Sequence, residues 1–537
     1  MDRRQRFLCP APASGCRLKV RAGQSAAQAL QDAGVSLAMS CERRICGTCR
    51  APVLAGTPGH CDHYFTEADR QRNDCFMPCC SRALGAQLRT DLCIFPTDHT
   101  TKETPPMSLS ELDGEIASHQ LYADPTRMHT VFDRLRSEDP LHWTEAPGHP
   151  PFWAVSRHAD VVEIGKHPDV FIAAPKTFLM NEEDLRIRVA ETATTGGKMV
   201  RTMIHMDEPD HKKYRGLTQP FFMPANIKRL EAIIQDRAQA LVGKMLERRD
   251  ACEFCNEIAV WFPLQIIMTL LAVPESDHAY LLKLTQQFLA PKDPTLRRDG
   301  PEAQGKGAVA REYFAYFGKM LAERRAAPPA DDLGSLIAHA QVDGEPLGMM
   351  EAVSYYVIIA TAGHDTTSSS MGSGLYNLLR QEGELERLRA RPEMMASAVE
   401  EMFRHGSPVK HFVRTAVRDY EMRGKTIRAG DEVALMYHCA NFDEEMFADA
   451  RAFRIDRAPN RQIAFGFGVH ACLGQNLARS SMRAFFNELL ARTADIELVG
   501  EPSFIASNQV GGLKALHVRV TPATATAKAA ADAGAPA

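Results

Sequence analysis

The stretch FGFGVHACLG, residues Phe465 to Gly474, decides the fold of most of this 537-residue chain. It has the spacing F-x-x-G-x-x-x-C-x-G, with Phe465 and Gly468 ahead of Cys472. A thiolate that binds a haem iron needs a loop just before a helix. It also needs glycines that turn backbone N–H groups toward sulfur, and an aromatic side chain that excludes water. We therefore predict that Cys472 is the axial ligand of haem b; a buried structural cysteine is the alternative.

This loop resembles the haem-binding loop of the cytochrome P-450 family, and the resemblance implies further motifs upstream. Glu401 and Arg404, in EMFR, lie three residues apart on one predicted helical face and resemble the family's ExxR pair. Arg457, in FRIDR, resembles the third member of that group. Without the cysteine loop, ExxR would indicate only an ordinary surface ion pair.

The resemblance also implies a set of haem-propionate ligands. Two buried carboxylates require cations nearby, whereas each basic residue taken singly is more often solvated or satisfied in the core. The residues that match the family here, beside Phe465 and Gly468 of the loop itself, are His211, Arg215, Arg414 and His470.

The segment ATAGHDTTSSS interrupts a long helical pattern with poor helix formers. In the family that it resembles, the acid and alcohol at this position deliver protons to the oxygen site, which assigns a catalytic role to Asp365 and Thr366. A polar interruption that only kinks the helix is the alternative. His364 is expected to be a bystander that faces another helix.

Four further stretches resemble the bacterial terpineol-hydroxylating branch of the family: ATAGHDTTSSS, HMDEPDHKKYRGLTQPFF, CANFDEEMF and VGGLK. This implies a small apolar substrate such as a monoterpenoid alcohol, with a steroid or an aromatic compound as the alternative. By family position the pocket uses residues 357–360, 409–413 and 508–510, and within them Val357, Ala360, Val409, Phe412 and Val510.

The N-terminal part of the chain carries a second metal motif. Cys41, Cys46 and Cys49 have the spacing C-x4-C-x2-C, and Cys79 follows at a distance, which is the plant-type 2Fe-2S pattern. A zinc site or a chance cluster is the alternative. CERRICGTC and FMPCCSRA resemble the ferredoxin domain of phthalate dioxygenase reductase, and the resemblance selects Cys79 as the fourth ligand; the other candidates are Cys75 and Cys80.

The chain is therefore predicted to be multidomain: an α+β ferredoxin, of β-grasp type by resemblance, followed by a mainly α haem domain with minor β-sheet. We place the ferredoxin at 1–95, a proline-containing polar linker at 96–110, the haem domain at 111–521 and a low-complexity tail at 522–537. The longest predicted helices cover residues 225–248, 309–325, 348–380 and 475–492. Strands are predicted at residues 17–21, 432–437 and 516–520, and a short helix of the ferredoxin is predicted at residues 25–33.

Composition limits the classes of function. A formal net charge of −4 gives no electrostatic case for nucleic-acid binding. The N-terminus has no apolar signal core, and the apolar run at 355–362 is far shorter than the roughly 20 residues of a membrane span. We expect a cytoplasmic protein that does not enter membranes.

These predictions combine into a monooxygenase that uses dioxygen and receives electrons through its own 2Fe-2S domain. No Gly-rich nucleotide-binding fingerprint is found, so the expected partner is a separate NAD(P)H-dependent flavoprotein reductase. An electron relay that serves another oxygenase is one alternative, and a haem sensor is another. Asp365 and Thr366 argue against the electron relay. A haem sensor would not need the cluster motif in the same chain.

Overall fold

In the computed structural model the chain divides into two units, Met1–Pro106 and Met107–Ala537. Each unit is described by itself. In the second unit the structure describes residues 108–194, 202–248, 250–289 and 306–523. In the first unit it describes only the strands, which are β1 (Gln5–Ala11), β2 (Ser14–Val20), β3 (Ala51–Ala55), β4 (Pro58–Gly59), β5 (Cys75–Phe76), β6 (Arg82–Ala83) and β7 (Gln87–Thr90).

Five strands of the first unit form a mixed sheet in the order β2-β1-β7-β3-β5, and β4 pairs separately with β6. β1 and β2 are an antiparallel hairpin, in which Cys9 is opposite Cys16, and β1 pairs with β7 in parallel. A parallel pair requires a crossover connection rather than a tight turn, which agrees with an α+β unit. The strand predicted at residues 17–21 corresponds to the second half of β2. The helix expected at residues 25–33 lies outside the described residues.

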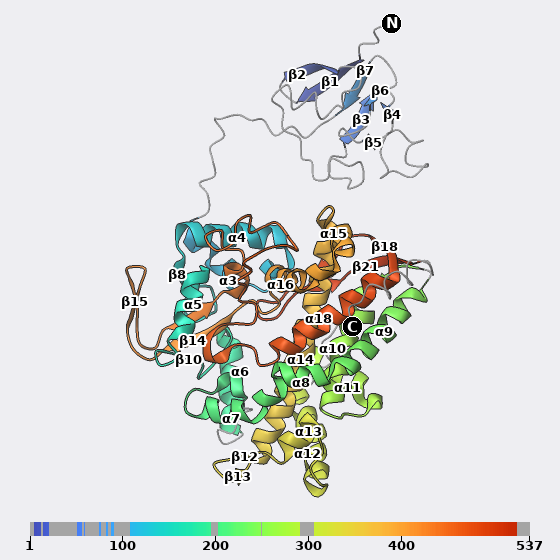
Figure 1. The fold of residues 1–537 in the computed structure, drawn as a ribbon. Coiled ribbons are helices and arrows are strands. Elements are labelled where there is room, and N and C mark those ends of the chain that lie inside the picture. Colours follow the sequence, from blue (N-terminus) through green and yellow to red (C-terminus); the bar gives the residue numbers. More distant parts are fainter. Residues whose placement is uncertain are drawn as a thin grey trace. The chain divides into compact units, whose positions relative to one another are not determined.

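The second unit is mainly helical, and Figure 1 shows α12 and α13 at its lower end. Its helices of six residues or more are α4 (Pro125–Glu138), α5 (His158–Lys166), α6 (Glu182–Thr194), α7 (Asp210–Thr218), α8 (Pro224–Arg229), α9 (Glu231–Leu246), α10 (Trp261–Leu270), α11 (His278–Leu289), α12 (Lys306–Ala326), α13 (Leu333–Ala338), α14 (Met349–Arg380), α15 (Glu384–Ala390), α16 (Met395–Gly406) and α18 (Gln475–Arg492).

The helix α14 is the central element of this unit, and it packs against α10, α12 and α16. Buried residues such as Val353, Tyr356 and Met371 occur along most of its length. Gly363 allows close packing, because a Cβ at this position would lie 2.7 Å from Cδ1 of Ile267 on α10. Such all-round burial is typical of a core helix.

The larger of the two main sheets lies on the side of the unit opposite α9, α10 and α11 (Figure 1). The larger sheet has the order β10-β14-β17-β9-β8. Its strands are β8 (Leu141–Thr144), β9 (Phe152–Val155), β10 (Phe171–Ile172), β14 (Phe412–Ala416) and β17 (Glu432–Leu435). A three-stranded sheet contains β11 (Cys252–Glu253), β18 (Thr493–Leu498) and β21 (His517–Pro522).

Most predicted elements agree with the structure to within a few residues, and α18 has the predicted bounds. The single helix predicted at 225–248 is wrong, because it is divided into α8 and α9 at Leu230. The Leu230 N–H donates to the Ile227 carbonyl, three residues back, and this tight turn redirects the chain. No glycine or proline marks the break, so the hydrophobic pattern could not reveal it.

The boundary of the second unit also differs slightly from the predicted one. A short helical turn already begins at Leu109, inside the stretch assigned to the linker. Among the described residues, no helix is both long enough and apolar enough to cross a membrane.

Candidate functional site

The Cys472 loop connects a short 3-10 turn, η8 (Gly468–His470), to the start of α18. The Cys472 N–H donates to the Phe465 carbonyl over 2.8 Å, which closes the loop around the thiol. Gly468 has a φ of +78°, and a Cβ there would lie 2.1 Å from the Gly165 carbonyl oxygen of α5. The loop can approach α5 this closely only with glycine at this position.

The groups around Cys472 partly favour the ionised form of its thiol. Burial raises its pKa, while the backbone of Gly474 and the charges of Arg215 and Arg479 oppose that rise. The Arg479 guanidinium lies over the Phe465 ring, 4.5 Å from the ring centre. Sequence reasoning missed Arg479, although its position about one turn into α18, seven residues after Cys472, was a usable signal.

The four predicted propionate ligands gather beside this loop. The rings of His211, from α7, and His470 lie 4.2 Å apart. Arg215 Nη2, also on α7, donates to the Ala471 carbonyl over 2.8 Å. Arg414, on β14, is 7% exposed and donates from Nη1 to the carbonyl of Val413.

This cation cluster (His211, Arg215, Arg414 and His470) has almost no acidic partner. Within the part of the chain that the structure describes, the only ion-pair contact of its members joins His211 Nδ1 to Glu208 Oε1 at 3.7 Å. His211 Nε2 is buried and has no hydrogen-bond partner. Burial, reinforced by Arg414 and the other cations, lowers the pKa of His470 to about 3.

Arg414 is buried and Arg215 is half-buried, and a cation removed from water without a counter-charge is costly, so the cluster indicates that an anionic group belongs there. A haem group provides two carboxylates and an iron that takes a thiolate ligand. The cation cluster would hold the carboxylates, and Cys472 would hold the iron. The residues therefore fit haem.

The Glu401, Arg404 and Arg457 side chains meet in a separate, fully buried cluster. Arg404, on α16, donates from Nε and Nη2 to the two carboxylate oxygens of Glu401, both at 2.8 Å. Arg457 Nε contacts both oxygens at 3.1 Å. The remaining guanidinium N–H groups donate to backbone carbonyls, including that of Asn441. This is an internally satisfied ion network rather than a surface pair.

Asp365 and Thr366 lie in the middle of α14 and are half-buried. The Thr366 hydroxyl donates to the carbonyl of Ala362 over 3.1 Å, a contact that bends helices. Burial raises the pKa of Asp365, and His364 opposes that rise. His364 is itself fully buried, with Nδ1 at 2.8 Å from the Ala360 carbonyl.

Two of the three predicted pocket segments are hydrogen-bonded to each other. Val409 and Val510 form an isolated antiparallel bridge, and the Lys410 N–H donates to the Gln509 carbonyl over 2.8 Å. The third segment contributes Val357 and Ala360 of α14, both buried. Phe412 begins β14 and is partly buried.

The predicted cluster ligands Cys41, Cys46, Cys49 and Cys79 lie outside the described residues, as does Cys80. Cys75 lies in β5, which pairs with β3. The 2Fe-2S assignment therefore depends on the sequence pattern and on comparison with known proteins.

Residues 12–84 match the family profile described as 2Fe-2S iron-sulfur cluster binding domain, and residues 279–493 match the profile of cytochrome P450. Cytochrome P450-terp from a Pseudomonas species is 38% identical over 411 residues, which cover 75% of this chain and 96% of the relative. The chain belongs to the cytochrome P450 family.

Two further relatives support this family assignment. Linalool 8-monooxygenase from Pseudomonas putida is 32% identical over 73% of this chain and 96% of its own length. The crystal structure of CYP108D1 from Novosphingobium aromaticivorans superimposes with a TM-score of 0.71 at 36% identity, covering 77% of this chain and 99% of that one.

These comparisons confirm the predicted fold class, the family resemblance, the two cofactors and the monooxygenase class. The P450 uses dioxygen and a hydrophobic substrate. When bound, its haem supplies dioxygen activation and its 2Fe-2S cluster supplies single electrons.

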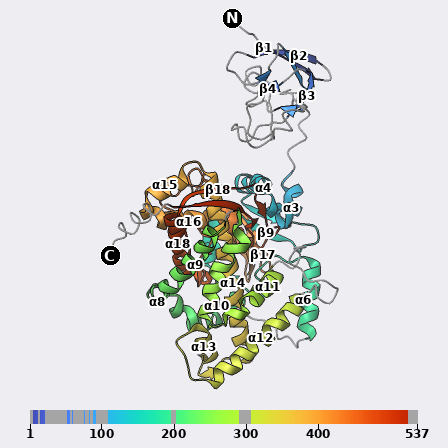
Figure 2. The same ribbon diagram turned by 90° about the vertical axis from the view of Figure 1, so that its right-hand side faces the viewer.

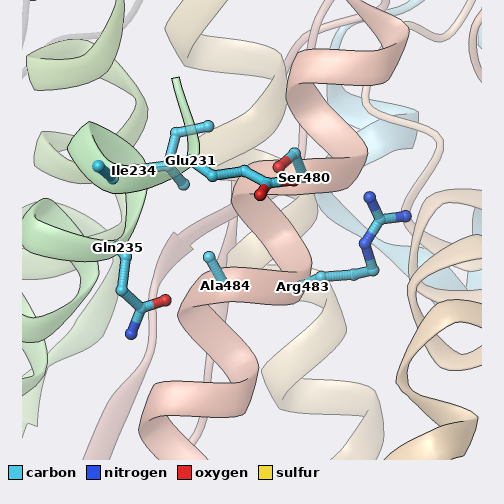
Figure 3. Close-up of a pocket in the computed structure, with 7 residues that line it drawn as sticks. Glu231, Ile234, Gln235, Ser480, Arg483 and Ala484 are labelled. Atoms are coloured by element: carbon cyan, nitrogen blue, oxygen red, sulfur yellow. The ribbon is translucent and has the colours of Figure 1, made fainter. Parts of the chain in front are cut away.

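A groove on the P450 unit between α9 and α18 is separate from this site. Gln235 of α9 donates there to Glu488 of α18 over 2.9 Å. Figure 3 shows the side chains that line the groove, among them Glu231, Ile234, Ser480, Arg483 and Ala484. No predicted site residue lines it.

Proposed function

We propose that this P450 hydroxylates a small monoterpenoid alcohol with electrons that pass from an external NAD(P)H-dependent flavoprotein reductase through its own 2Fe-2S domain. The observation that carries the proposal is the presence of both family matches in one chain, together with a relative named cytochrome P450-terp that is matched over 96% of its length. Linalool 8-monooxygenase, whose name also specifies a monoterpenoid alcohol, supports the substrate class.

The proposed pocket suits such a substrate, because its five predicted residues, Val357, Ala360, Val409, Phe412 and Val510, are all apolar. A compact apolar molecule gains about 25 cal/mol for each Å² of apolar surface that it buries against them. These residues would also exclude water from the reacting atoms.

We assign proton delivery to Asp365 and Thr366. The raised pKa of Asp365 keeps its carboxyl group protonated to a higher pH than an exposed aspartate, as suits a proton donor. Among the described residues, no ion pair involves Asp365, so the proton is not displaced by a neighbouring cation. The Thr366 hydroxyl is held by its bond to Ala362 on the same face of α14.

The fused ferredoxin domain replaces the encounter between two separate proteins. A linker of about 15 residues gives a tethered domain an effective concentration that reaches the millimolar range. The first electron therefore arrives faster than it would from the same ferredoxin added separately at micromolar concentration.

The test is turnover of the purified chain with NADPH, a ferredoxin reductase and α-terpineol or linalool. We expect a substrate-induced spectral shift and a hydroxylated product that carries one oxygen atom from labelled dioxygen. Cys49→Ser should abolish product formation, whereas the matched variant Cys16→Ser, in a strand of the same domain, should preserve it.

The alternatives give different results. An electron relay would oxidise NADPH without forming a hydroxylated product. A spectral shift with a steroid or an aromatic compound, and none with any monoterpenoid, would contradict the proposed substrate class.

A further inference from the structure

His411 is a fully buried histidine just before β14, between the predicted pocket residues Val409 and Phe412. Its Nε2 accepts a hydrogen bond from the backbone N–H of Leu179 over 3.0 Å. Leu179 belongs to the connection between β10 and α6, which is not part of the predicted pocket. One side chain thus links a pocket strand to a distant segment.

The hydrogen bond fixes the protonation state of the ring. Since Nε2 accepts from an N–H group, it carries no proton, and the proton of the neutral ring is on Nδ1. Nδ1 is buried near the main chain of Asn508 without a hydrogen bond of standard geometry. Burial lowers the pKa of His411 to about 4, which agrees with a neutral ring at pH 7.

The segment held by His411 has further contacts with the same strand. The Val413 N–H donates to the Thr177 carbonyl over 2.7 Å, and the Phe178 ring lies 4.8 Å from that of Phe412. The Phe178 ring also meets His411 edge to face at 6.0 Å. Residues 177–179, which we call the latched segment, therefore rest against β14 directly beside the pocket.

The pocket segment at residues 508–510 lies against the same histidine, because the main chain of Asn508 is close to its ring. The Asn508 Nδ2 donates to the Ala117 carbonyl over 2.8 Å, and its backbone N–H lies 3.3 Å from His119 Nδ1. His411 is accordingly located where the latched segment, β14 and the turn at 508–510 converge.

We propose that the neutral His411 ring is a positioning residue that latches residues 177–179 against the substrate pocket and releases them when it is protonated. A protonated Nε2 cannot accept from the Leu179 N–H, so protonation and the latched state exclude each other. In the released state the ring returns toward its usual pKa of about 6.5. Acid therefore favours release between that pH and about 4.

The charged groups near His411 do not offset this effect. His119, which faces the ring, lowers its pKa further. Lys410 turns away, with Nζ at 3.1 Å from the Ser407 carbonyl, and Lys176 of the neighbouring segment pairs with Glu432 at 2.7 Å. Among the described residues, no ion pair involves His411.

The test compares His411→Leu with His411→Gln in the full chain with both cofactors bound. Leucine removes the acceptor, whereas the glutamine side-chain oxygen restores it. His278→Leu is the matched control, because His278 is also buried and also has one hydrogen bond with the main chain, in its case with the Val273 carbonyl at 3.3 Å. Hydrogen exchange of the Leu179 amide, measured without substrate, reports the latch directly.

For His411→Leu we expect at least about fivefold faster exchange of the Leu179 amide, since one hydrogen bond is worth about 1 kcal/mol. For the same reason the dissociation constant for α-terpineol should rise about fivefold. The kcat should stay within about twofold of the wild-type value. His411→Gln should resemble the wild type at pH 7. Between pH 7 and pH 5 we expect α-terpineol binding to weaken in the wild type but not in His411→Gln. His278→Leu should change neither property.

Unchanged Leu179 exchange in His411→Leu, or equal effects of His411→Leu and His278→Leu, would overturn the proposal. The inference rests on the proposed function only through the choice of α-terpineol. If no monoterpenoid binds the wild type, the proposed substrate fails, while the exchange measurement still decides whether the latch exists.

Discussion

Two groups of charged side chains lie in the P450 unit, one buried and one partly buried, and they differ in how their charge is balanced. Around Glu401, two arginines share one carboxylate, and backbone carbonyls accept the remaining N–H groups. In the cation cluster beside Cys472, the arginines Arg215 and Arg414 have no carboxylate partner in the described structure. The first group is complete within the protein, whereas the second requires an external anion.

The difference separates a folding role from a binding role. A buried ion network with all its partners contributes to one arrangement of the chain, and losing a member leaves an uncompensated charge. A buried cation without a partner destabilises the apoprotein and gains its partner when a ligand binds. Unbalanced burial of charge, rather than burial alone, therefore indicates the cofactor site.

The largest effect should come from breaking the complete group. Glu401→Gln leaves Arg404 and Arg457 buried without a counter-charge, so we expect a loss of about 3–5 kcal/mol in the free energy of unfolding, with or without haem. Chemical denaturation of both forms measures it. Asp169→Asn, which breaks an exposed pair with Arg418, should cost far less, because water screens that pair. Equal losses would contradict the comparison.

Asp365 extends the comparison to a half-buried acid that has no ion-pair partner among the described residues. Asp365→Asn keeps the shape but removes the proton donor, so we expect product formation to fall about 100-fold while α-terpineol binding changes little. Steady-state product analysis and spectral titration separate the two quantities. An equal fall in binding would instead assign Asp365 to the substrate pocket.

The incomplete group should respond in the opposite way from the Glu401 group. Arg215→Met should speed haem transfer to an acceptor protein by about tenfold, because one charge-assisted contact to a carboxylate is lost. The apoprotein should be unchanged or more stable, because an uncompensated charge has been removed. Lys212→Met, at an exposed neighbouring position on α7, is the matched control. Destabilised Arg215→Met apoprotein would assign Arg215 a folding role.

Lys410 is a buried group of a third kind, because it has no acidic partner among the described residues but can lose its charge. Its Nζ lies 3.4 Å from His438 Nδ1. Burial lowers its pKa to about 7, below the unfolded value of 10.5. Between these values the unfolded chain binds more protons, so stability rises with pH, by at most about 1.4 kcal/mol per pH unit. Urea denaturation between pH 7 and pH 10 should show this slope in the wild type. Lys410→Met should reduce it, and an unchanged slope would show that another group titrates.

The features that could be predicted from the sequence are those that depend on residues close together in the chain. The spacing around Cys472, the ExxR pair and the bounds of α18 follow from local chain geometry. The meeting of Glu401 with Arg457, 56 residues later, was implied only by resemblance. The break at Leu230 and the contact between His411 and Leu179, 232 residues apart, depend on tertiary packing, which no local pattern encodes.

The central claim is that one chain holds a thiolate-bound haem and a 2Fe-2S cluster. The most direct test is the absorbance spectrum of the purified protein, reduced by dithionite with and without carbon monoxide, together with iron and acid-labile sulfide counts. We expect the carbonyl band of a thiolate-bound haem, plus two irons and two sulfides beyond the haem iron. A spectrum without that band would show that Cys472 does not bind haem iron and would contradict the account.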